Sequence, residues 1–173
     1  ARAFQAAARR PARSLILLAT TGEEFGLIGA EYFVNRLDRL PGQTVAALNI
    51  DGTSVTSFKL FDVRGGSNSS LGATARAAGE SLDVAVQLEP IGVGGSAHSP
   101  FLLAGIPVLW VGATLPAGWM NTHYHTPQDD MRQPLDLNAA ARYTRFVFLT
   151  TYLVADASNR PNWNRGEFFS QKR

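Results

Sequence analysis

Four short segments hold the side chains that could bind a metal or move a proton. They are Glu23-Glu24, Asn49–Asp51, Ser96–Pro100 and His123–Asp129. Two adjacent carboxylates at the end of a strand point in different directions, so one could bind a metal while the other transfers a proton. An aspartate and a histidine from other strand ends would add the oxygen and nitrogen ligands that a catalytic zinc accepts. The combination predicts a hydrolase.

Each segment taken alone also has an ordinary structural interpretation. Glu23-Glu24 could be first-turn acids of a helix, which the helix dipole favours. Asp51-Gly52 is typical of a turn, His98 could be a helix-entry residue, and His123 could be a solvated surface residue. The joint occurrence of the four segments favours a functional site.

The elements that must position these segments alternate between strands and helices. Continuous apolar runs predict buried strands, polar ends mark where they stop, and helical spacing marks the segments between them. We expect strands at 14–20, 45–50, 60–63 and 106–111, a short edge strand at 85–88, and helices from Phe25 to Leu37 and at 70–79, 100–104 and 137–154. Residues 1–8 have the character of the last turns of a helix. This order predicts a layered α/β sheet with ligands at the carboxyl ends of its strands.

Composition supports one globular domain over residues 1–173 and excludes several function classes. Hydrophobic residues make up 45% of the chain, and no apolar run reaches the roughly 20 residues of a membrane span. The net charge is +2, and the basic residues are scattered, which argues against nucleic-acid binding. The chain has no cysteine, so thiol catalysis and cysteine-bound metals are excluded.

The four segments resemble motifs of the co-catalytic di-zinc aminopeptidases, the family of bacterial leucyl aminopeptidases and glutamate carboxypeptidase-like enzymes. Residues 20–33 resemble the glutamate-pair segment, and residues 47–51 resemble the metal-aspartate strand. Residues 95–107 resemble the substrate-side loop, and residues 124–129 resemble the terminal metal-histidine motif. The resemblance implies a three-layer α/β/α sandwich with a mixed sheet and a secreted or periplasmic location.

The resemblance also implies roles for individual residues. Glu23 resembles the general base, and Tyr124 resembles the residue that hydrogen-bonds the oxyanion of the tetrahedral intermediate. Glu24 and His125 resemble ligands of one zinc, and Asp51 resembles a ligand of the other. We therefore expect Glu24, Asp51 and His125 to converge in space. The expected substrate-contacting residues are His98, Trp110, Trp119 and Met120.

Two parts of the family pattern have no counterpart in this chain. These are the family's His-x-Asp motif and its bridging aspartate, which in the family lie upstream of the glutamate pair. In addition, Ala97 stands before His98 where family members commonly have aspartate. By this resemblance the domain lacks its N-terminal strands, so we expect low zinc occupancy and an exposed sheet edge that favours a homo-oligomer.

Three functions remain open on the sequence. The first is cleavage of N-terminal residues from peptides by a zinc-dependent hydrolase. The second is metal-independent hydrolysis of small activated or aromatic esters at a metal-poor site, formed by Glu23, His98, Tyr124, His125 and nearby hydroxyls, with apolar contacts from Trp110, Trp119 and Met120. Ser96 or Ser99 beside His98 is only a weak candidate nucleophile. The third is a non-catalytic binding or assembly role.

Overall fold

A mixed four-stranded sheet forms the centre of the molecule. The computed structural model describes residues 1–36, 43–51, 60–113, 117–133 and 136–172. The strands are β1 (Ala47–Ile50), β2 (Leu60–Arg64), β3 (Ala85–Glu89) and β4 (Val108–Ala113). They lie in the order β1-β4-β2-β3, with β1 parallel to β4, β2 parallel to β3, and β2 antiparallel to β4. The strand predicted at 85–88 corresponds to β3, and its predicted position at an edge of the sheet is confirmed.

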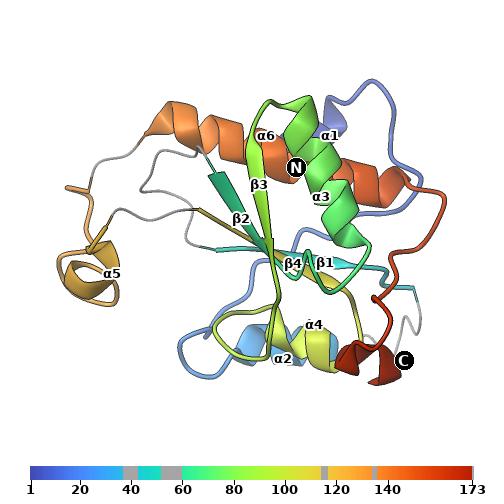
Figure 1. Ribbon diagram of the computed structural model, residues 1–173. Helices are drawn as coiled ribbons and strands as arrows, with labels where there is room; N and C mark the ends of the chain where they lie inside the picture. Colours follow the sequence, from blue (N-terminus) through green and yellow to red (C-terminus); the bar gives the residue numbers. More distant parts are fainter. Residues whose placement is uncertain (37–42, 52–59, 114–116, 134–135, 173) are drawn as a thin grey trace.

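Helices cover both faces of this sheet (Figure 1). On one face lie α3 (Leu71–Ser81) and α6 (Leu137–Asp156), and on the other lie α2 (Ile28–Val34) and α4 (Ser99–Leu103). Residues of β4 alternate between the two cores, because Leu109 and Val111 pack towards α3 and α6 while Val108 packs towards α4. The predicted three-layer α/β/α sandwich with a mixed sheet is confirmed.

The prediction of a buried strand at 14–20 is wrong. The segment belongs to no strand, and Ile16, Leu17 and Leu18 are 60%, 64% and 42% exposed. The apolar run has strand character, but a strand also needs a neighbour that accepts and donates backbone hydrogen bonds. None of the strands that the structure describes pairs with it.

The first predicted helix is shorter than its apolar spacing suggested. The chain turns tightly through residues 23–27, where Leu27 has a positive φ of 61°, and α2 begins only at Ile28. The predicted helix end at Leu37 lies outside the described residues. The expected N-terminal helix is confirmed only as the single turn α1 (Arg2–Gln5).

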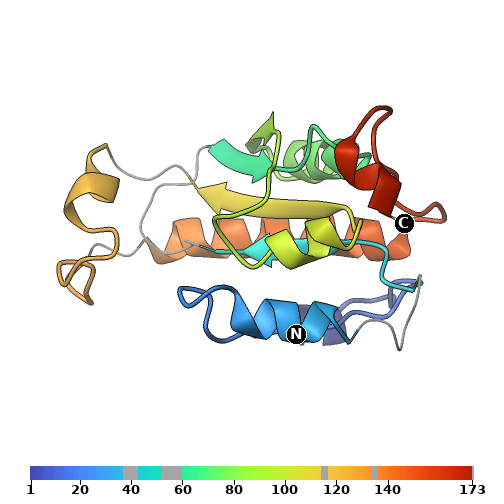
Figure 2. The same ribbon diagram turned by 90° about the horizontal axis from the view of Figure 1, so that it is seen from below.

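The short helix α5 (Trp119–Thr122) and the loop after it stand apart from the three layers (Figure 2). This lobe lies beyond the carboxyl end of β4, the end of the sheet at which Asp51 follows the parallel strand β1. The chain closes with the short 3-10 helix η2 (Phe168–Lys172), which adds Phe169 to the core beneath α4. No helix in the described ranges is both long and apolar enough to cross a membrane.

Candidate active site

Two of the predicted site residues, Glu24 and His125, meet in space although they are far apart in the sequence. Glu24 lies in the turn before α2, and His125 lies in the loop after α5. The Nε2 atom of His125 is 2.7 Å from Oε1 of Glu24, and both side chains are more than half exposed. The fold therefore brings a carboxylate and an imidazole into direct contact.

Glu23 and Tyr124 flank this pair. Burial raises the pKa of Glu23, and the negative charges of Glu24 and Asp51 raise it further. Burial and the Glu24 charge likewise raise the pKa of Tyr124, whose ring stacks on His125 with 3.7 Å between ring centroids. An acid with a raised pKa suits proton transfer near neutral pH, and a phenol with a raised pKa stays a hydrogen-bond donor.

Asp51 is held at the end of β1 by a chain of hydrogen bonds. The hydroxyl of Ser96 donates to Oδ2 of Asp51 at 2.8 Å, and Nδ2 of Asn49 donates to that hydroxyl, also at 2.8 Å. Asn49 and Asp51 are two residues apart, so they lie on the same face of the extended chain. This role of Ser96 was not predicted from the sequence, although the spacing of Asn49 and Asp51 is a signal that could have suggested it.

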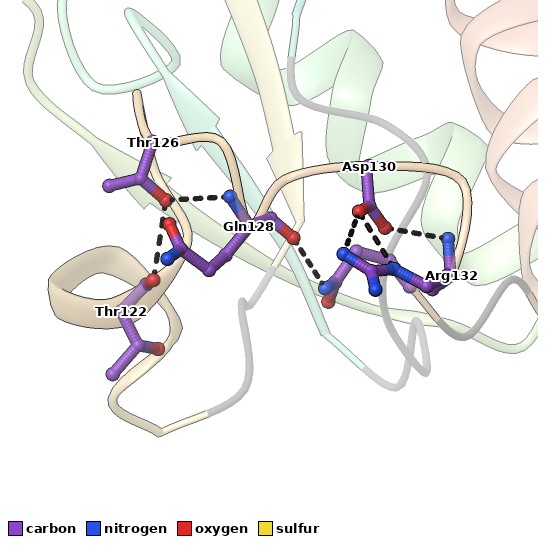
Figure 3. Close-up of polar contacts among 6 residues, drawn as sticks. Thr122, Thr126, Gln128, Asp130 and Arg132 are labelled. Carbon is purple, nitrogen blue, oxygen red and sulfur yellow. Dashed lines mark hydrogen bonds and ion pairs between the residues drawn. The ribbon is translucent and has the colours of Figure 1, made fainter.

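The loop that carries His125 is folded by its own polar side chains (Figure 3). The hydroxyl of Thr126 donates to the carbonyl of Thr122 at 3.3 Å and accepts from the backbone N–H of Gln128, also at 3.3 Å. Further along, Oδ1 of Asp130 accepts from the backbone N–H of Arg132 at 2.9 Å. His125 itself has a positive φ of 55°, which is rare for a residue with a side chain. The loop thus holds the imidazole in a conformation that the chain would not adopt freely.

His98 and Trp110 stack on each other beside the loop that carries Ser96. His98 is 1% exposed, and its Nε2 lies 3.0 Å from the carbonyl of Gly92. Its ring stacks on Trp110, and the guanidinium of Arg64 covers the same indole at 4.6 Å. Burial lowers the pKa of His98. These contacts support the loop that positions Ser96, and direct contact of His98 with a substrate would require that loop to move.

Trp119 and Met120 lie on the α5 lobe beside the site. Trp119 is largely buried and stacks on His123, whereas Met120 is half exposed. The hydroxyl of Thr122 lies 2.7 Å from Nδ1 of His123. Of the predicted substrate-contacting residues, Met120 is therefore the most accessible, and substrate contact by all four stays a prediction.

The two candidate serine nucleophiles are already engaged in other hydrogen bonds. Ser96 donates to Asp51, and the hydroxyl of Ser99 accepts from the backbone N–H of Gly94 at 2.7 Å. Both serines are buried, and the described hydrogen bond of His98 goes to Gly92 instead of to either hydroxyl. The arrangement lacks the serine-to-histidine contact that nucleophilic catalysis uses.

The donor atoms of Glu24 and His125 fit zinc in kind, since zinc binds carboxylate oxygen and imidazole nitrogen. A catalytic zinc usually has three protein ligands. Among the residues that the structure describes, no three His, Asp or Glu side chains gather closely enough to hold one ion. The predicted convergence is thus shown for Glu24 and His125. The charge of Asp51 contributes to the raised pKa values of Glu23 and Tyr124, but Asp51 completes no group of three ligands among the described residues.

Solved structures with the same fold come from bacterial aminopeptidases. LapA of Legionella pneumophila aligns with a TM-score of 0.66 and 20% identity, over 80% of this chain and 39% of its own. BSAP, a zinc aminopeptidase from Bacillus subtilis, aligns with a TM-score of 0.67 and 22% identity, over 82% and 36%. The aminopeptidase of Aneurinibacillus sp. strain AM-1 gives 0.65 and 20%, over 79% and 32%.

The chain therefore spans well under half of the length of these structures. No curated protein sequence matches it. The sequence model of peptidase family M28 matches residues 1–151, which is most of the chain. The chain thus belongs to peptidase family M28, and the predicted resemblance to the zinc aminopeptidases is confirmed.

Proposed function

We propose that this chain carries the hydrolytic centre of an M28 aminopeptidase, which removes N-terminal residues from peptides with the help of zinc. The observation that supports it most directly is the 2.7 Å contact between Glu24 and His125, with Glu23 beside it. Glu24 and His125 lie in loops at one end of the sheet, and α/β folds bind their ligands at such ends.

Glu24 and His125 would hold one zinc, and Asp51 would contribute to a second. Zinc, when bound, supplies a Lewis acid that polarises the peptide carbonyl. Because the described residues supply only two converging ligands, we expect this chain to hold zinc weakly unless further donors complete the site.

The remaining steps belong to side chains of the chain itself. The carboxylate of Glu23 would accept a proton from the attacking water and deliver it to the leaving amine. The phenol of Tyr124 would donate a hydrogen bond to the oxyanion that develops on the carbonyl. The raised pKa values of both groups support these roles, because Glu23 becomes a stronger base and Tyr124 stays protonated.

The test is hydrolysis of leucine p-nitroanilide with added zinc. Glu23→Gln removes the base but keeps the shape, so we expect activity to fall by about 100-fold or more. Glu31→Gln is the matched control, because Glu31 is an exposed glutamate on nearby α2, and it should keep full activity. Full activity in Glu23→Gln would contradict the assigned base.

The same assay separates the other functions left open by the sequence. Hydrolysis of p-nitrophenyl esters that persists in chelator, without hydrolysis of the anilide, would favour the metal-independent esterase. Absence of both activities in zinc would favour the non-catalytic role. The secreted or periplasmic location stays a prediction.

A further inference from the structure

The loop between β3 and α4, residues 90–98, carries Ser96, whose hydroxyl donates to Asp51 and so ties the loop to the candidate site. Three of its nine residues are glycines, and Gly94 and Gly95 have positive φ values of 102° and 83°. Glycine restricts the backbone less than any other residue. Contacts with other segments must therefore select the loop conformation that brings the serine to the aspartate.

Asn68, in the turn after β2, supplies such a contact. It is only 8% exposed, and its Oδ1 accepts from the backbone N–H of Ile91, near the start of the loop, at 2.9 Å. Its Nδ2 donates to Oε2 of Glu167 at 3.0 Å, and its backbone carbonyl accepts from the N–H of Asn164 at 2.9 Å. One buried amide thus joins the loop to a segment far along the chain.

That segment, residues 162–169, is itself fixed to the body of the protein. It follows α6 and runs back to α4 (Figure 1). Nε1 of Trp163 donates to the carbonyl of Gly105 at 2.9 Å, and Phe169 packs into the core beneath α4. The segment lies beyond residues 1–151, which the family model matches. It therefore gives the turn after β2 a fixed support from outside the matched region.

We propose that Asn68 is a positioning residue for the candidate active site, which holds the start of the glycine-rich loop so that Ser96 meets Asp51. Since a carboxylate only accepts hydrogen bonds, Glu167 binds the NH2 group of the Asn68 amide and leaves Oδ1 facing Ile91. The inference rests on the proposed function for the role of Asp51, whereas the chain of contacts can be tested without hydrolysis.

A double-mutant cycle tests that chain of contacts. Asn68→Ala and Ser96→Ala should each lower the urea midpoint of unfolding. If both residues act through one loop, the double variant should lose clearly less than the sum of the two single losses, because the second change finds the loop already released.

Asn164→Ala is the matched control for the cycle. Nδ2 of Asn164 donates to the carbonyl of Ser67 at 2.7 Å, so this side chain joins the same turn to the same segment without a contact to the loop. Its loss should add in full to that of Ser96→Ala. Should Asn68→Ala not fold, Glu167→Ala, which removes only the outer support of the amide, takes its place.

An exchange of donor and acceptor provides a rescue. Asn68→Asp keeps an acceptor for Ile91 but sets a second carboxylate against Glu167, so the urea midpoint should fall. Adding Glu167→Gln to this variant restores a donor and an acceptor at that contact, and most of the lost midpoint should return.

Hydrolysis of leucine p-nitroanilide in zinc tests the consequence for the site. Asn68→Ala should lower kcat by about tenfold and leave KM little changed, because a misplaced group costs rate more than binding. Asn164→Ala should keep the natural kcat.

Additive losses for Asn68→Ala and Ser96→Ala, or the same coupling for Asn164→Ala, would overturn the proposal. So would a natural kcat in Asn68→Ala. A natural chain that does not hydrolyse the anilide in zinc would instead refute the proposed function, and the cycle would still decide whether Asn68 places Ser96.

Discussion

His125 combines a ligand-type side chain with an unfavourable backbone conformation. Its φ of 55° lies in the left-handed region, where a side chain costs roughly 1 kcal/mol. Strained residues persist where the surrounding structure holds them, and they concentrate at functional sites. The hydrogen bonds of Thr126 hold this turn in place.

Removal of the His125 side chain should therefore abolish the proposed hydrolysis with little change in the free energy of unfolding. His125→Gly relieves the strain but loses an exposed ion pair with Glu24 worth at most about 1 kcal/mol. We expect the free energy of unfolding in urea to change by less than about 1 kcal/mol, while His125→Val, which keeps the strain, lowers it further. A large destabilisation by glycine would contradict the strained conformation.

Ser96 is the residue that fixes Asp51. Ser96→Ala would leave the amide of Asn49 and the carboxylate of Asp51 without their shared partner. We expect a loss of about 1–3 kcal/mol in the free energy of unfolding. Ser96→Thr, which retains the hydroxyl, should recover part of it. Equal losses in the two variants would mean that the packing of Ser96, and not its hydrogen bonds, provides the stability.

His98 should make the fold sensitive to acid. Burial lowers the pKa of His98 in the folded chain, with a smaller contribution from Arg64, so the unfolded chain binds a proton more readily. Stability should therefore fall as the pH drops below the usual histidine pKa of about 6.5. His98→Gln keeps a donor for Gly92 but cannot titrate, and its unfolding free energy should fall less between pH 7 and pH 5. An identical fall in both proteins would refute this.

At the scale of elements, α6 closes the core and depends on a well-formed beginning. The side chain of Asp136 accepts a hydrogen bond from the backbone N–H of Ala139 at 2.9 Å, which caps the helix. Asp136→Ala should lower the free energy of unfolding by about 1 kcal/mol, and Asp136→Asn should keep most of it. Urea denaturation measures both, and an unaffected alanine variant would show that the cap contributes nothing.

The elements that were predicted correctly from the sequence are those that pair or pack with other elements among the described residues. The runs at 60–63 and 85–88 form β2 and β3, which pair with each other, and helical spacing located α6 closely. The run at 14–20 has the same apolar character, but composition cannot reveal whether a neighbouring strand is available. That information is non-local, and it decides whether an apolar run becomes a strand.

The candidate site likewise has residues that the sequence predicted and contacts that it did not. The motifs identified Glu23, Glu24 and His125 as candidates, and the fold brings Glu24 and His125 together. The link from Ser96 to Asp51 and the burial of His98 depend on how the loop before α4 packs. Such packing depends on tertiary contacts, which periodicity does not encode.

At the scale of the whole molecule, the chain contributes part of a family M28 fold, with the proposed base and two converging ligands at one end of its sheet. Because no third close ligand lies among the described residues, zinc binding should be weak. It should also depend on both Glu24 and His125. Binding and proton transfer should therefore be separable by mutation.

Zinc content after dialysis, measured by elemental analysis, tests this account most directly. We expect less than one zinc per natural chain. Glu24→Gln and His125→Ala should each remove most of that zinc, whereas Glu23→Gln should retain it. Two tightly held zincs per chain, or zinc that survives the loss of both Glu24 and His125, would contradict the account.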